Sequence, residues 1–104
     1  IDQHRFVQLM STSPAKMFGL FPKKGTIAVG SDGDVILWDP EKEHTISVKT
    51  HHMRVDYNPY EGRVVTGAPA VVLSRGEVIV DHGVFKGAKG RGQYIKRQAG
   101  HPRL

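Results

Sequence analysis

The 104-residue sequence contains no cysteine, which excludes a disulfide, a thiolate nucleophile and a cysteine-ligated metal site. No apolar run approaches the roughly 18 residues that a membrane-spanning helix needs, and no charged-then-apolar signal peptide opens the chain. We therefore expect a cytoplasmic location and no membrane partner. Apolar residues make up only 38% of the chain, against roughly 45–50% in typical domains on a count that includes glycine, so any core is predicted to be thin.

Acidic side chains are absent after Asp81, while six basic ones follow it: Lys86, Lys89, Arg91, Lys96, Arg97 and Arg103. Residues 1–81 carry nine Lys and Arg against ten Asp and Glu, so the net charge of +5 comes from the tail. A basic tail is one footprint of nucleic-acid binding, but a charge block alone more often marks a solvated or subunit-contacting segment. We favour a subunit contact, and a free-standing basic β-rich module that binds nucleic acid remains the alternative.

The N-terminal residues have a helical pattern. Asp2 is a suitable cap for a helix over about residues 3–10, in which Phe6, Leu9 and Met10 form one apolar stripe. The residues at 11–14 predict a break, with Ser13 as the cap of a second short helix over about 15–18 and Gly19 at its end. These helices bury little by themselves. Because the chain opens inside this pattern, we expect it to be a cut piece of a longer protein.

The most apolar run is Val35-Ile36-Leu37-Trp38, within GTIAVGSDGDVILWDP. It predicts a strand over 34–38 that is buried on both faces, with Trp38 in the core and a polar turn at 39–42. Other extended segments are predicted over 25–29, 44–49, 63–66, 69–73 and 77–81. The last two are joined at Ser74-Arg75-Gly76, which predicts a tight hairpin with Gly76 at positive φ.

No complete motif for catalysis, metal binding or phosphate binding is found in the sequence. The six histidines are His4, His44, His51, His52, His82 and His101. None forms an HxH or helical i, i+4 pair, and two adjacent histidines on a strand point to opposite faces. Asp32 and Asp34 are interpreted as turn-capping residues rather than calcium ligands, and no helix pattern follows GAKGRG as a phosphate loop would need. We predict no catalytic, cofactor-binding or metal-binding residue in this chain.

Three stretches of the sequence resemble segments of a known protein family. STSPAKMFGLFPKKGTIAVGSDGDVILWDP is similar to the helix–loop–strand passage from barrel to β-sandwich in cyclic amidases. Its GTIAVGSDGDVILWD part is shared broadly across amidohydrolases, although Gly33 replaces the more usual alanine. HMRVDYNPYEG and VVLSRGEVIVDHGVFKGAKGRGQYIKR are more specific. Together they resemble the C-terminal end of the dihydropyrimidinase and D-hydantoinase family of cyclic amidases. The Asn-Pro of NPYEG favours the enzymes over the non-catalytic collapsin-response mediator proteins, which are kept as a further alternative.

The resemblance implies a parent hydrolase that opens the cyclic amide of dihydropyrimidines or hydantoins, as in pyrimidine catabolism. Such enzymes hold two metal ions, usually zinc, in a (β/α)8 barrel, bound by histidines, an aspartate and a carboxylated lysine. The family's ligands lie upstream of Ile1, and none is carried over. The segment alone is expected to be inactive.

The expected fold is mainly β with two short N-terminal helices. We assign residues 1–24 to the last barrel-associated helices and exit loop, 25–85 to the C-terminal part of a β-sandwich, and 86–104 to a glycine-rich basic tail. The expected partners are the remainder of the parent chain and, through the tail, neighbouring subunits of a homotetramer. The isolated piece is expected to expose apolar strand edges and to associate with itself.

Overall fold

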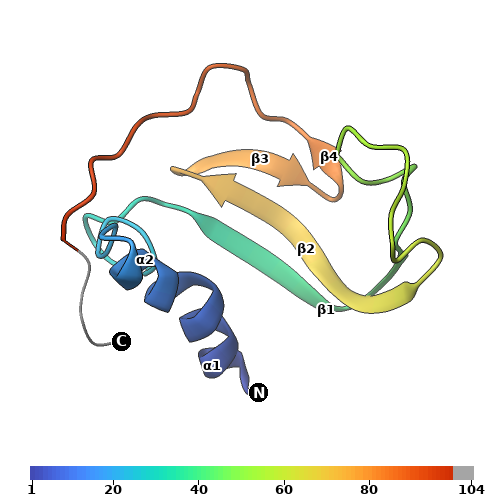
Figure 1. The fold of residues 1–104 in the computed structure, drawn as a ribbon, viewed down its shortest axis with the longest axis horizontal. Coiled ribbons are helices and arrows are strands. Elements are labelled where there is room, and N and C mark those ends of the chain that lie inside the picture. The colour runs from blue at the N-terminus through green and yellow to red at the C-terminus, as the bar shows by residue number, and fades with distance from the viewer. Residues whose placement is uncertain (100–104) are drawn as a thin grey trace.

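The computed structural model describes residues 1–99. One antiparallel sheet has the strand order β1-β2-β3-β4, and a short helical segment lies beside one end of it (Figure 1). The elements are α1 (Gln3–Val7), η1 (Gln8–Thr12), α2 (Ser13–Met17), β1 (Val35–Thr45), β2 (Val64–Ser74), β3 (Glu77–Asp81) and β4 (Val84–Phe85). The predicted mainly β fold with short N-terminal helices is confirmed. A second sheet, as a sandwich would need, is not present among residues 1–99.

The N-terminal helices form one continuous segment. Asp2 caps it as predicted, since its Oδ1 accepts from the Arg5 amide at 2.7 Å. The predicted break is wrong: Ser13 has helical dihedral angles and no capping role. Pro14 has no N–H to donate to the carbonyl four residues back, and the turn before it widens to a π-helix in which the Ser13 amide bonds the Gln8 carbonyl. Gly19, at φ +70°, ends the segment as predicted.

Strand β1 is longer than the sequence predicted. The polar turn expected at 39–42 is wrong, because β1 continues through it and pairs with β2 as far as Thr45. Asp39 pairs with Ala68 and Glu43 with Thr66. Residues 40–42 of β1 therefore lie opposite the single residue Gly67 of β2 and form a bulge. Pro40 lies in this bulge, where its missing N–H costs no ladder hydrogen bond. Of the strand predicted over 44–49, only residues 44 and 45 are strand, as the end of β1, and the prediction is wrong for residues 46–49, which lie in a loop and turn.

Strand β2 joins two segments that the sequence separated at Gly67. This glycine has φ +96°, and a Cβ on it would lie 3.1 Å from Cζ2 and Nε1 of Trp38. A side chain at this position would therefore meet both an unfavourable backbone conformation and the indole ring. Glycine lets the backbone pass against Trp38 without interrupting the strand.

The β2–β3 hairpin is confirmed, including the predicted bounds of β3. Ser74 pairs with Glu77, and the two turn residues have φ +50° at Arg75 and +77° at Gly76, as a two-residue hairpin of the primed type needs. The extended segment predicted at 25–29 is wrong, because these residues form turns and bends without a strand partner. Their backbone lies in the loop from α2 to β1, called the exit loop here.

Little apolar surface is covered. Ala15 and Ala68 are the only buried hydrophobic residues in the part of the chain that the structure describes. Ile36 and Leu37 are 58% and 55% exposed, and neighbouring strand residues point to opposite faces. The prediction that this strand is buried on both faces is therefore wrong for this chain alone, as is a core position for Trp38, which is 54% exposed. Both faces of the sheet lack a covering layer among residues 1–99.

Candidate functional site: a polar junction of three segments

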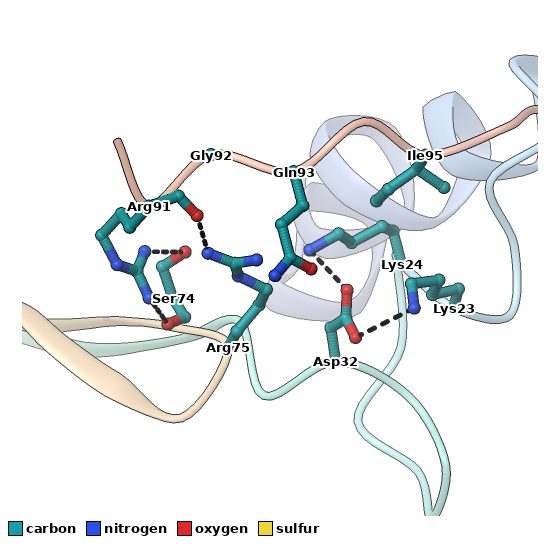
Figure 2. Close-up of a pocket in the computed structure, with 9 residues that line it drawn as sticks. All are labelled: Lys23, Lys24, Asp32, Ser74, Arg75, Arg91, Gly92, Gln93 and Ile95. Atoms are coloured by element: carbon teal, nitrogen blue, oxygen red, sulfur yellow. Dashed lines mark hydrogen bonds and ion pairs between the residues drawn. The ribbon is translucent and has the colours of Figure 1, made fainter. Parts of the chain in front are cut away.

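A hollow lies where the exit loop, the β2–β3 turn and the tail meet (Figure 2). It has a volume of about 230 Å³. The lining residues are Lys23, Lys24, Asp32, Ser74, Arg75, Arg91, Gly92, Gln93 and Ile95. With the adjacent Asp34 and Glu77 they form a cluster that we call the polar junction.

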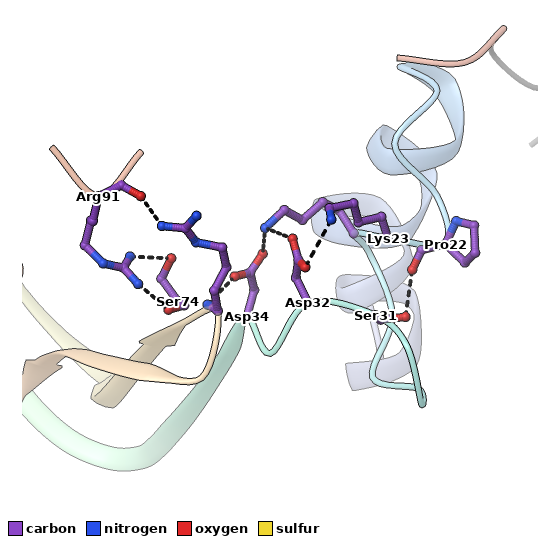
Figure 3. A network of polar contacts seen from close by, with 9 residues as sticks. Pro22, Lys23, Ser31, Asp32, Asp34, Ser74 and Arg91 are labelled. Atoms are coloured by element: carbon purple, nitrogen blue, oxygen red, sulfur yellow. Dashed lines mark hydrogen bonds and ion pairs between the residues drawn. The ribbon is translucent and has the colours of Figure 1, made fainter. Parts of the chain in front are cut away.

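Asp34 fixes the exit loop to the hairpin, while Asp32 pairs with two lysines of the loop itself (Figure 3). Lys24 Nζ lies 2.9 Å from Asp32 Oδ2 and also pairs with Asp34. The second carboxylate oxygen of Asp34 accepts from the Arg75 amide at 2.9 Å, and the Gly76 amide donates to the Gly33 carbonyl at 2.9 Å. The aspartates expected to cap their own turn thus bind lysine and the tip of a distant hairpin instead.

These contacts shift the ionisation of all three groups. The hydrogen bond from Lys24 lowers the pKa of Asp32 from its usual 3.8. Burial opposes ionisation of Asp34, but hydrogen bonds from Lys24 and the Arg75 amide outweigh it, so its pKa is also lowered. Burial likewise opposes the charge of Lys24, yet its hydrogen bonds to the two aspartates leave its pKa raised above 10.5. The three groups are therefore charged at neutral pH, and the one lysine lies between two carboxylates with a net charge of −1.

The tail is attached to the hairpin by Arg91. Its Nη1 donates to Ser74 Oγ at 2.9 Å and its Nη2 to the Ser74 carbonyl at 2.7 Å. Its Nε donates to Glu77 Oε2 at 2.9 Å, and its own carbonyl accepts from the Arg75 guanidinium. Further along, the Gln98 amide donates to the Gly19 carbonyl at 3.0 Å. The tail therefore bridges the hairpin and the end of α2.

The polar junction is an assembly of ion pairs rather than a catalytic constellation. It contains no histidine, and each of its carboxylates lies against a cation or an amide. An acid held ionised by such partners is a poor general base or acid near neutral pH. This arrangement can hold the exit loop, the hairpin and the tail together, and it can bind a charged group.

The metal pair implied by the resemblance does not fit the described residues. Within residues 1–99 no group of three or more His, Cys, Asp and Glu side chains is close enough to hold an ion. At Asp81 one carboxylate and one histidine lie together: His82 Nδ1 lies 2.6 Å from Asp81 Oδ1, and Lys86 Nζ lies 2.8 Å from Asp81 Oδ2. The hydrogen bond from Lys86, and to a smaller extent the one from His82, lowers the pKa of Asp81. His101 lies outside the described residues.

Sequence reasoning did not find the polar junction. Asp34 and Arg75 are 41 residues apart, and Arg91 and Ser74 are 17 apart. No periodicity connects such distant positions. The available signals were the paired acids around Gly33, which were interpreted as turn-capping residues, and the arginine within GAKGRG, which was assigned to a subunit-contacting tail. No helix in residues 1–99 is long and apolar enough to cross a membrane.

Comparison with known proteins identifies relatives over almost the whole chain. The chain is 58% identical over 97 residues to a D-hydantoinase of Geobacillus stearothermophilus, covering 93% of this chain and 21% of that protein. It is 53% identical over 98 residues to a dihydropyrimidinase of Rattus norvegicus, covering 94% and 19%. The chain thus spans about a fifth of the length of these relatives.

Solved structures give the same result. A D-hydantoinase from a Bacillus species superposes with a TM-score of 0.92 at 53% identity, over 97% of this chain and 22% of that one. An L-hydantoinase from Arthrobacter aurescens superposes with a TM-score of 0.89 at 35% identity, over 93% and 22%. The family model described as Amidohydrolase family matches residues 1–88. This chain therefore belongs to the amidohydrolase family.

Proposed function

We propose that this chain is a structural segment of a metal-dependent hydrolase that opens the cyclic amide of dihydropyrimidines or hydantoins. In that reaction water adds to a ring carbonyl carbon, the ring C–N bond breaks, and a carboxylate and a ureido group result. The observation that carries the proposal is the identity of 53–58% to a D-hydantoinase and a dihydropyrimidinase. We place the metal ions, expected to be two zinc ions with a carboxylated lysine, in a part of the parent outside this chain.

The role of this segment is to join the small sheet to the remainder of the parent. The two uncovered sheet faces support it, since residues 36 and 37 expose apolar side chains on opposite sides. In this proposal residues 1–24 contact a barrel and 25–85 complete a β-sandwich with strands from elsewhere in the parent. A C-terminal position in the parent is not supported by the matches reported above. It stays a prediction, tested by the reading frame on either side of the chain.

We assign the tail, residues 86–104, a second role in a homotetramer located in the cytoplasm. The described part of this tail, residues 86–99, carries basic side chains on a backbone without helix or strand. Its attachment at Arg91 would hold it in a fixed direction. Neither a nucleic-acid-binding module nor a non-enzymatic homologue is favoured, because the relatives carry the names of enzymes.

The experiment compares the full-length protein with this chain alone. Ring opening of dihydrouracil and hydantoin is followed by loss of substrate absorbance, with and without a metal chelator. We expect the full-length protein to be active, to lose activity with the chelator and to regain it with zinc, and the chain alone to be inactive. Hydrolysis by the chain alone, or a full-length protein that hydrolyses neither substrate, would overturn the proposal. Size-exclusion chromatography with light scattering tests the tetramer.

A further inference from the structure

We propose that the hollow of the polar junction binds a small oxyanion, such as phosphate or a carboxylate, with Arg75 as its main ligand. The inference does not depend on the proposed reaction. Three properties support binding: the charges of the polar junction, the unused hydrogen-bond donors of Arg75 and the size of the hollow.

The charges of the polar junction favour an anion. Four cations surround it, Lys23, Lys24, Arg75 and Arg91, against three carboxylates, Asp32, Asp34 and Glu77. Each carboxylate has an ion-pair partner, since Lys24 lies against both aspartates and Arg91 pairs with Glu77, although the buried Oδ2 of Asp32 accepts no well-aligned hydrogen bond. Asp32, the one carboxylate that lines the hollow, also lies 3.6 Å from Lys23 Nζ. One positive charge is left over inside a concave surface, where a field attracts counter-ions.

The donors of Arg75 are mostly unused. Its Nη2 donates to the Arg91 carbonyl, and its other guanidinium N–H groups make no hydrogen bond to residues 1–99. A guanidinium presents five N–H donors in a planar fork that matches two oxygens of a carboxylate or phosphate. Figure 2 shows this guanidinium directed into the space between the hairpin and the tail, beside the Gln93 amide.

The size of the hollow suits a small ion. At about 230 Å³ it is smaller than the roughly 300–1,000 Å³ typical of pockets for drug-sized ligands. It has room for about eight waters at roughly 30 Å³ each, some of which an ion would displace.

Binding is tested by calorimetry on the full-length protein, titrated with inorganic phosphate or acetate against chloride at constant ionic strength. Arg75→Asn is the test variant, because asparagine tolerates the positive φ of this turn position and the backbone contact to Asp34 needs no side chain. Arg75→Lys keeps the charge without the fork. Arg54→Asn, an exposed arginine outside the hollow, is the matched control.

We expect saturable binding of at least one probe. Affinity should fall at least tenfold in Arg75→Asn, fall by a smaller factor in Arg75→Lys and be unchanged in Arg54→Asn. Circular dichroism and melting temperature establish that each variant is folded. If Arg75→Asn misfolds, the Arg75→Lys variant decides the matter. Binding that is unaffected by the substitutions at Arg75, or no saturable binding of either probe by the unchanged protein, would overturn the proposal.

Discussion

Replacing Arg91 with leucine is expected to release the tail from the β2–β3 hairpin. The side chain is only 21% exposed and makes two charge-assisted hydrogen bonds to Ser74, each worth roughly 1.5 kcal/mol or somewhat less at a partly exposed site. Its pair with Glu77 adds at most about 0.5 kcal/mol, since the Glu77 side chain is 70% exposed. The loss is therefore about 2–3 kcal/mol, or a roughly 30- to 150-fold rise in the released population.

The population is measured by trypsin cleavage at Lys96 and Arg97 in the folded full-length protein. When the tail opens and closes faster than it is cut, the cleavage rate follows the released fraction. Lys89→Leu is the matched control, because it removes one positive charge and one trypsin site from the same segment, and Lys89 makes no hydrogen bond or ion pair with residues 1–99. Cleavage as slow in Arg91→Leu as in the control would refute this account of the tail.

The remaining predictions concern backbone, pH and association. Gly67→Ala should lower the free energy of unfolding by about 1–3 kcal/mol, because its φ of +96° is strained for alanine and the Cβ would press on Trp38; Gly92→Ala, with open space around it, should be nearly neutral. The pKa of Asp34 is lowered on folding, so its stabilisation is present above about pH 4 and is lost as pH falls through the folded value. A denaturant series at decreasing pH should therefore show a shallower loss in Asp34→Asn. The chain produced alone should self-associate through its uncovered sheet faces, and a monodisperse monomer in analytical ultracentrifugation would contradict that.

Local signals predicted the features that depend on a few neighbouring residues. Asp2 starts the helical segment because its side chain reaches an amide three residues on. Gly19 ends it, and Gly76 forms the hairpin turn, because each position needs a positive φ. In these cases the residues that form the structure are also adjacent in the sequence.

Long-range pairing explains what the sequence did not predict. The residues around Pro40 carry strong turn signals, yet pairing of β1 with β2 on both sides absorbs them as a bulge. Gly67 similarly interrupts the pattern of β2 without ending the strand. Burial of Trp38 was inferred from an apolar run, but the layer needed to cover it is not formed by residues 1–99. The contacts of Arg91 involve partners that no local pattern specifies.

The bulge in β1 limits how the sheet can grow. β1 is one of the two outer strands, and among residues 1–99 nothing pairs with its free edge. Its second half carries Pro40, which offers no N–H, followed by the charged residues 41–43, and both features discourage edge-to-edge stacking of copies. An incoming strand from elsewhere in the protein would meet the bulge at residues 40–42, which divides the edge of β1 into a stretch at 35–39 and a shorter one at 43–45.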